Sequence, residues 1–198
     1  MRSSLVSSYS FSVFSHNLTS VNLRCITIFS KRITLKPISS VYESDIFREF
    51  TDEVAKYTVP QPSDDIADTR DLIACACEEM NRGTDFTTVV IDRTTGRFLG
   101  CAGLRHIHTR EPKVGIWLAK SAQGRGIGKE VVSALWEWAE ANLEYDFLYY
   151  PVVVDYLPSR RLVESLGGVL HGERKMKNTR GVEFDAVGYE IPRRSAKE

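Results

Sequence analysis

The stretch that decides the fold is Gln123-Gly124-Arg125-Gly126-Ile127-Gly128. The alternating segment before it, residues 113–119, is typical of a strand. After it, apolar residues recur at helical spacing from Ile127 to Leu143, which predicts a long amphipathic helix. A strand, a glycine-rich turn and a helix in this order aim backbone N–H groups and a helix N-terminus at an anion. The stretch therefore predicts a binding site for a diphosphate.

Spacing argues against two common phosphate-binding loops. A Walker loop needs glycine at position 123 and serine or threonine at position 130, but the chain has Gln123 and Glu130. Without that hydroxyl there is no Mg²⁺ ligand, so NTP hydrolysis is excluded. In a dinucleotide fingerprint the third glycine would come one residue later than Gly128, and no acidic residue is well placed about 20 residues on.

The rest of the chain predicts a mixed α/β layer fold. Alternating or continuous apolar runs predict strands at residues 33–36, 87–91, 98–104, 147–154, 169–170 and 184–191. Helical spacing predicts one helix that begins near Ser44, one from Ser63 to Gly83 and one at residues 158–166. The resulting order is β-α-α-β-β-β-α-β-α-β-β.

Composition limits the partners and the compartment. The chain has 198 residues and carries 26 Lys and Arg against 26 Asp and Glu, so it lacks the basic excess typical of nucleic-acid proteins. Its longest nearly apolar run, residues 147–154, is too short to cross a membrane. Four cysteines without a C-x-x-C pair favour reduced thiols and a cytoplasmic location.

The N-terminal thirty residues differ from the rest. They hold nine serines and two arginines but no acidic residue, which is consistent with a bland disordered extension, an organellar transit peptide or a secretory signal. We therefore expect an extension at residues 1–30, one domain at 31–192 and a tail at 193–198.

The glycine-rich stretch resembles motif A of the GCN5-related N-acetyltransferases (GNAT), Q/R-x-x-G-x-G/A. Residues 114–118 are similar to the strand that precedes this motif in the RimJ/RimL-like branch. Tyr150-Pro151-Val152 and residues 159–168 resemble motif B of that branch, and residues 33–37 resemble its first strand. The resemblance covers about residues 31–192, with the motifs in the right order.

This resemblance implies a mixed, mostly antiparallel central sheet, splayed between its fourth and fifth strands and flanked by helices. It implies acetyl-CoA as co-substrate and no metal. The strand before the loop would pair with the pantetheine arm, and the loop would hold the diphosphate. The residues implied to bind acetyl-CoA are Ile116, Trp117, Leu118, Gln123, Gly124, Arg125, Gly126, Ile127, Gly128, Lys129 and Ser159.

The catalytic positions depart from the family pattern. Lys113 stands where many relatives carry a glutamate base, Tyr156 where motif B has an asparagine, and Val163 where many carry a tyrosine that acts as general acid. We interpret Glu111 or His106 as a replacement base, because each would share a strand face with its i+2 neighbour. Tyr156 is the candidate proton donor to the thiolate. His106 and His108 alone are too few ligands for zinc.

The expected function is acetyl-CoA-dependent transfer of an acetyl group to a primary amine, either a protein N-terminal α-amine or a small-molecule amine. The alternative is a non-catalytic acyl-CoA-binding module, which the departures at Lys113, Tyr156 and Val163 favour. The residues expected near the acceptor are Phe47, Tyr57, Asp64, Asp65, Asp68 and Asp71. Their four aspartates form an acidic helix face, which either attracts a cationic amine or is an ordinary solvated face. Monomer and homodimer both remain open.

Overall fold

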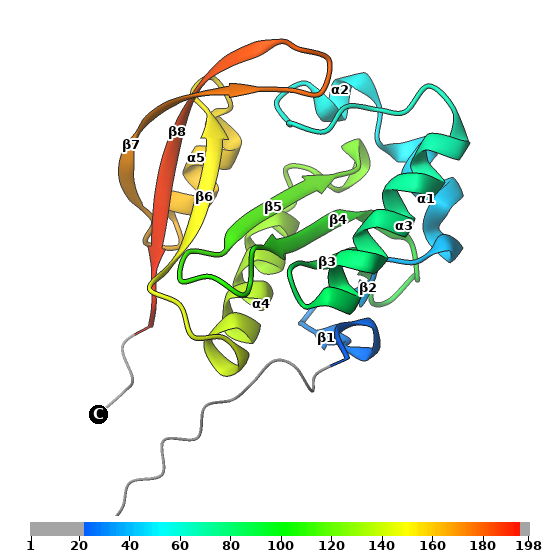
Figure 1. The fold of residues 1–198 in the computed structure, drawn as a ribbon, viewed down its shortest axis with the longest axis horizontal. Helices are drawn as coiled ribbons and strands as arrows, with labels where there is room; N and C mark the ends of the chain where they lie inside the picture. Colours follow the sequence, from blue (N-terminus) through cyan, green and yellow to red (C-terminus); the bar gives the residue numbers. More distant parts are fainter. Residues whose placement is uncertain (1–21, 195–198) are drawn as a thin grey trace, which may run out of the picture.

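The computed structural model describes residues 22–194, which build one eight-stranded sheet in the order β1-β2-β3-β4-β5-β6-β8-β7 (Figure 1). All neighbours are antiparallel except β5 and β6. The strands are β1 (Ile28–Phe29), β2 (Ile33–Pro37), β3 (Phe86–Asp92), β4 (Phe98–Arg105), β5 (Lys113–Leu118), β6 (Phe147–Val153), β7 (Val169–Lys177) and β8 (Glu183–Pro192).

The sheet opens between β5 and β6. These two strands pair at a single position, Lys113 with Tyr149, and then diverge, whereas β4 and β5 pair along their whole length. Beyond Lys113 the edge of β5 that faces β6 is therefore not paired with a strand. β5 and β6 are the fourth and fifth strands that the sequence predicts, so the predicted splay and the mixed, mostly antiparallel sheet are confirmed.

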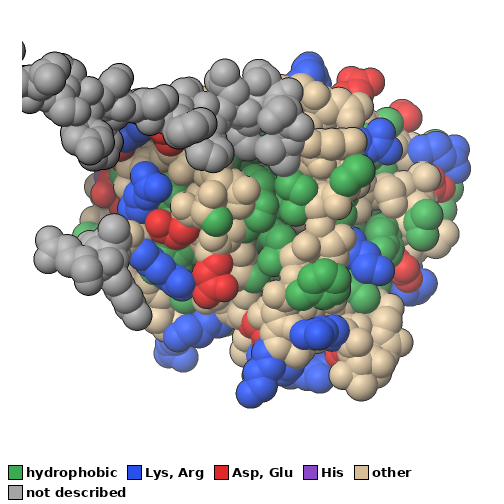
Figure 2. Space-filling model, turned by 90° about the horizontal axis from the view of Figure 1, so that it is seen from below, with side chains coloured by type: hydrophobic (Ala, Val, Ile, Leu, Met, Phe, Trp, Pro, Cys, Tyr) green, Lys and Arg blue, Asp and Glu red, His purple; other side chains and the backbone are tan. Residues whose placement is uncertain are grey.

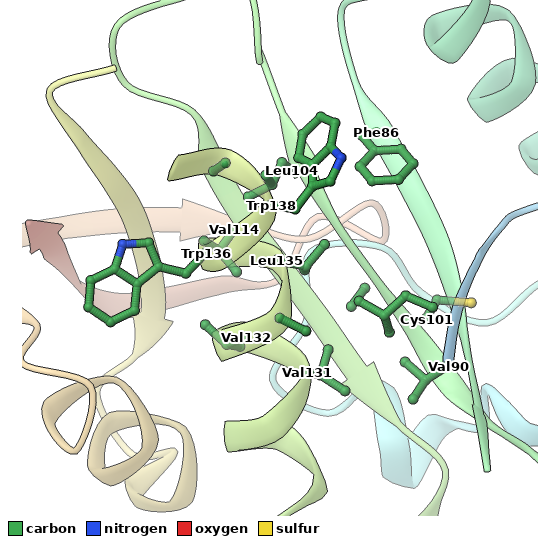
Figure 3. Close-up of a cluster of buried hydrophobic side chains, with 14 of the residues drawn as sticks. Phe86, Val90, Cys101, Leu104, Val114, Val131, Val132, Leu135, Trp136 and Trp138 are labelled. Carbon is green, nitrogen blue, oxygen red and sulfur yellow. The ribbon is translucent and has the colours of Figure 1, made fainter. Parts of the chain in front are cut away.

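Helices cover both faces of the sheet. They are α1 (Glu43–Glu49), α2 (Asp52–Ala55), α3 (Ile66–Arg82), α4 (Ile127–Asn142) and α5 (Leu157–Glu164). Trp117 of β5 packs on Phe50 at the end of α1, with ring centroids 4.6 Å apart. Val114 lies three positions earlier and so points to the opposite face, toward α4 (Figure 3).

The core beneath α4 follows the predicted helical spacing. Val131, Leu135 and Trp138 are buried and face β3–β5 (Figure 3). The indole of Trp138 contacts Phe86 at a centroid distance of 4.6 Å. Burying such side chains contributes roughly 1.5–3 kcal/mol each, so α4 is held firmly against the sheet.

The first predicted helix is in fact two short helices. α1 ends before Phe50, and the side chain of Thr51 then accepts a hydrogen bond from the Val54 N–H at 3.4 Å to begin α2. The prediction of one helix that begins near Ser44 is therefore wrong, because Thr51 is an N-cap residue inside the apolar pattern. α3 ends at Gly83 as predicted, with a φ of 71° at that glycine.

The folded domain begins earlier than residue 31. Leu23 is buried in the core, and Ile28 pairs with Leu35 across β1 and β2. The serine-rich composition of the segment conceals these apolar residues, so the boundary expected at residue 31 is corrected. The remainder of the predicted extension, residues 1–21, and most of the predicted tail, residues 195–198, lie outside the described residues.

The start of the predicted tail packs on α4. The Arg194 N–H donates to Glu140 at 2.7 Å, and the Arg194 guanidinium lies 4.2 Å from the Trp136 ring centroid. Over the described part of the chain, every helix is too short or too polar to cross a membrane.

Candidate active site

Two adjoining cavities meet where β5 and β6 separate. One, of about 340 Å³, lies beside residues 122–129 and is called the loop-side cavity. The other, of about 490 Å³, lies beneath β7 and the segment after α2 and is called the hairpin-side cavity. Both are lined by Ile116, Trp117, Tyr150, Tyr156 and Ser159. The two cavities thus adjoin at the gap in the sheet, where the same five residues line both of them.

Glycines shape the loop-side cavity. Gly124 and Gly126 have φ angles of 70° and 73°, which favour glycine, and Gly126 directly precedes α4. No side chain caps the first turn of α4. Its backbone N–H groups therefore remain available to an anion at the positive end of the helix dipole. This arrangement fits a diphosphate.

Gly128 has a different role. A Cβ atom there would lie 2.8 Å from Cδ1 of Leu162, so the missing side chain lets α4 and α5 approach each other. Lys129 joins the same helices, because its Nζ donates to the Ser165 carbonyl at 3.1 Å. α5 is thereby positioned as the second wall of the loop-side cavity.

Arg32 holds the glycine-rich loop from outside the cavity. Its Nε lies 2.7 Å from Glu130 Oε2, and its Nη1 donates to the Arg125 carbonyl at 2.9 Å. Burial raises the pKa of the Glu130 carboxyl, but the hydrogen bonds and charge of Arg32 outweigh this and lower it below its ordinary value. The ionised carboxylate thus anchors Arg32, and Arg32 fixes the loop.

Nine of the eleven residues predicted to bind acetyl-CoA line the loop-side cavity: Ile116, Trp117, Leu118, Gln123, Gly124, Gly126, Gly128, Lys129 and Ser159. The other two do not. Ile127 is buried in the core, so only its backbone faces the loop. Arg125 is exposed, and its Nη1 donates to the Ser121 carbonyl at 3.4 Å.

Two protonated tyrosines stand at the junction of the cavities. Tyr156 stacks on Tyr57 with centroids 4.8 Å apart, and burial raises the pKa of its hydroxyl. The hydroxyl of Tyr150 is 2.9 Å from Ser159 Oγ, and burial raises the pKa of Tyr150 to about 12. Both phenols therefore keep their protons at neutral pH, which suits a proton donor better than a base.

Glu111 and His106, the predicted bases, do not line either cavity. β5 begins at Lys113, so Glu111 lies in an exposed turn and does not share a strand face with Lys113. β4 ends at Arg105, and His106 has a φ of 56° while its N–H donates to Asp85 at 2.9 Å. The alternation of strand faces stops before both residues.

The expected acceptor residues are mostly elsewhere. Of that set only Tyr57 lines the hairpin-side cavity, and the acidic residues of and before α3 do not reach it. Val163 is fully buried and packs on Gly168. Cations that the sequence reading did not single out border the cavity instead; they are Arg105, Arg174, Lys175 and Lys177. The sequence offers a signal for only two of them, because Lys175 and Lys177 are two residues apart in β7 and so share a strand face.

Metal ligands are not clustered in the described structure. Within residues 22–194, no group of three or more His, Cys, Asp or Glu side chains is placed to hold a metal ion. The rings of His106 and His108 lie 6.4 Å apart on the surface.

A splayed mixed sheet and an uncapped helix behind a glycine loop are the features that the resemblance to acetyl-CoA-dependent acyltransferases implies, and a second cavity lies across the splay. Comparison with known proteins gives the family. Residues 32–169 match the model of the acetyltransferase (GNAT) domain, so the chain belongs to the GNAT N-acetyltransferases, in the RimJ/RimL-like branch that the sequence indicates.

Individual relatives agree with this assignment. An uncharacterized N-acetyltransferase p20 from Bacillus licheniformis is 24% identical over 159 residues, which are 76% of this chain and 89% of the relative. The structure resembles the ribosomal-protein-S5-alanine acetyltransferase from Vibrio fischeri, with a TM-score of 0.74, 18% identity and coverage of 87% and 100% of the two chains. It also resembles the microcin C7 self-immunity acetyltransferase MccE in complex with acetyl-CoA and AMP, with a TM-score of 0.74, 18% identity and coverage of 82% and 93%.

Proposed function

We propose that this protein transfers the acetyl group of acetyl-CoA to a primary amine bound in the hairpin-side cavity, and that Tyr156 protonates the departing thiolate. The observation that carries the proposal is that the two cavities share Tyr156 in their common wall. A donor in the loop-side cavity and an acceptor in the hairpin-side cavity would meet at this hydroxyl.

The loop-side cavity fits the elongated donor. The N–H groups from Gly124 to Lys129 are placed to bind the diphosphate, and the open edge of β5 offers backbone groups to the amide bonds of pantetheine. Acetyl-CoA supplies the activated thioester. Lys129 and Arg161 also line this cavity and add positive charge for the phosphates of the donor.

Acetyl transfer needs a neutral amine, a held carbonyl and a proton for the sulfur. No carboxylate or histidine of the described residues lines either cavity, so we assign deprotonation of the amine to solvent. The amine nitrogen then forms a bond to the acetyl carbon, and the carbon–sulfur bond breaks. Tyr156 donates its proton to the thiolate, the acylated nitrogen releases its extra proton to solvent, and solvent returns a proton to the Tyr156 phenolate. The raised pKa of Tyr156 keeps that proton in place through neutral pH.

The test replaces the hydroxyl alone. Tyr156→Phe retains the ring that stacks on Tyr57 and is expected to lower kcat by about 100-fold in a thiol-release assay with an amine panel. Stabilisation by acetyl-CoA in a thermal-shift assay should be unchanged. Tyr42→Phe, which removes a hydroxyl outside both cavities, is the matched control. Stabilisation by acetyl-CoA without thiol release from any amine would instead favour the binding-module alternative.

The four cysteines of the chain are free thiols in the structure. This supports the proposal that the protein works in a reducing, cytosol-like compartment.

A further inference from the structure

The charged side chains that line the hairpin-side cavity are all cations. They are Arg105, Lys113, Arg174, Lys175 and Lys177, and no Asp or Glu of the described residues joins them. The chain as a whole is balanced, with 26 cationic and 26 acidic residues. Both signs also occur together on the face shown in Figure 2. The residues that line the cavity therefore carry positive charge, whereas the chain as a whole has no net charge.

Arg105 and Lys113 are the strongest indication that this cavity binds an anion. They are directly opposite each other in the β4–β5 ladder and therefore point to the same face of the sheet. Like charges in this position repel and weaken strand pairing. Among residues 22–194, no carboxylate forms an ion pair with either of them. A negatively charged ligand between the two side chains would turn this repulsion into binding energy.

The remaining cations come from β7, across the cavity. Lys175 forms an ion pair with Asp185 of β8 and is already neutralised. The Arg174 guanidinium lies 5.4 Å from the Tyr149 ring centroid and donates to its hydroxyl at 2.7 Å, which leaves further N–H donors free. Lys177 has no ion pair within the described chain. Cationic residues of three strands, β4, β5 and β7, thus line one cavity.

These cations lie away from the transfer point. Ile116 and Trp117 are at the wall shared by the cavities, three and four residues along β5 from Lys113. At about 3.3 Å per residue, the Cα of Lys113 lies about 10–13 Å from that wall. An acceptor whose nitrogen reaches the wall would meet the cations with a group several bonds away.

We propose that the acceptor is a primary amine that carries a carboxylate or phosphate several bonds from its nitrogen, as in a peptide with acidic residues directly after its N-terminus. This inference rests on the proposed function and names its substrate class. It disfavours a polyamine, whose second charge would face Arg105 and Lys113. Anions of different origin share this recognition chemistry, so the test must separate peptide carboxylates from the phosphate of a small amine.

Thiol release is measured with acetyl-CoA and three C-terminally amidated peptides, Ser-Glu-Glu-Leu, Ser-Gln-Gln-Leu and Ser-Lys-Lys-Leu. Two small amines, 6-aminohexyl phosphate and hexylamine, form the second arm. We expect kcat/KM at low salt to be at least about tenfold higher for the anionic member of each arm than for its neutral partner. This ratio should fall as salt increases, because exposed charges are screened. The arm with the larger ratio identifies the source of the anion.

Variants test the assigned residues. Lys113→Gln should reduce the ratio of kcat/KM between the acidic and neutral peptides by about tenfold, and Lys36→Gln, an exposed strand lysine outside the cavity, should leave it unchanged. Lys113→Glu should reverse the preference toward the lysine peptide. It should also raise Tm, since Arg105 would then face an opposite charge.

Two outcomes separate this inference from the proposed function. Equal turnover of the three peptides, or faster turnover of the lysine peptide by the unmodified protein, would overturn the anionic acceptor and leave the acetyltransferase proposal intact. Absence of thiol release from any amine would count against the proposed function. Calorimetric binding of the same peptides to the CoA-saturated protein would then decide the charge preference, which equal affinities would refute.

Discussion

The two cavities of this protein are built in different ways. The loop-side cavity comes largely from one continuous segment, residues 116–129, and its key groups are backbone N–H donors at Gly124 and Gly126. The hairpin-side cavity combines side chains from the segment after α2, the facing ends of β4 and β5, and β7. In the proposed function, acetyl-CoA is therefore recognised by backbone shape, and the amine acceptor by side chains that only the tertiary fold brings together.

If the backbone conformation of the glycine-rich loop forms the loop-side cavity, a substitution that disfavours this conformation should abolish the binding of acetyl-CoA. Gly126→Val places a β-branched residue at a φ of 73° directly before α4. We expect at least a 100-fold loss of acetyl-CoA affinity, measured by calorimetry, because the N–H groups of the first turn no longer converge.

Gly96→Val is the matched control for this change. Gly96 has a φ of 72° in the turn between β3 and β4, far in sequence from the loop, and lines neither cavity. Both variants should lose about 1–3 kcal/mol of stability from backbone strain. An equal loss of affinity in the two variants would show that general destabilisation, and not the shape of the loop, explains the result.

Arg32→Ala tests the support of the loop from outside. We expect about a tenfold weaker affinity for acetyl-CoA and a loss of about 1 kcal/mol in unfolding free energy, since the pair with Glu130 is half exposed on the arginine side.

The pH dependence gives a second readout. Because the pKa of Glu130 is lowered in the folded protein, its contribution to stability is present above the ordinary value of 4.5 and is lost as the pH falls through the folded value. Arg32→Ala should flatten this part of a chemical-denaturation profile. An unchanged profile would contradict the proposed anchoring.

The same contrast explains what the sequence could reveal. The glycine spacing at 124–128 fixes a local conformation, so it indicated the loop and the helix, and the family resemblance that it carries implied nine of the lining residues. Strand patterns likewise indicated the sheet, because alternation depends on neighbours in the chain. Apart from the alternation of Lys175 and Lys177 along β7, the cations of the hairpin-side cavity follow no local sequence pattern. Arg105 and Arg174 line one cavity only because β4 and β7 lie on opposite sides of the splay.

Arg180→Ala tests the hairpin-side cavity alone. Arg180, in the turn between β7 and β8, binds Asp52 at 2.7 Å and the Pro62 carbonyl at 3.3 Å, and so ties the hairpin to the segment around α2. The tie is partly exposed, so we expect a modest effect, with KM for the amine about threefold higher. Acetyl-CoA affinity should not change. Weaker acetyl-CoA binding would mean that the two cavities are mechanically coupled.

The smallest effect on activity is expected at the two predicted bases, because each was assigned on the assumption that a strand continues through it. Glu111 and His106 were predicted as bases on the assumption that β5 and β4 continue through them, but both strands stop short. Pro112 begins no ladder with β4, and the positive φ of His106 turns the chain away. Side chains that line neither cavity cannot accept a proton from a bound amine without a relay.

We therefore expect Glu111→Gln and His106→Asn to keep kcat/KM within about twofold of the unmodified protein from about pH 5 to 8, the range in which an imidazole titrates. Asparagine is chosen because it tolerates the backbone conformation of His106, so any loss of activity reports the missing imidazole rather than strain. A tenfold loss in His106→Asn, together with disappearance of the acidic limb of the pH profile, would restore His106 as the base. Profiles in both variants that match the unmodified protein would leave the neutral amine and the Tyr156 hydroxyl as the groups that set the rate. The difference between the two cavities would then extend to the chemistry, because neither supplies a base.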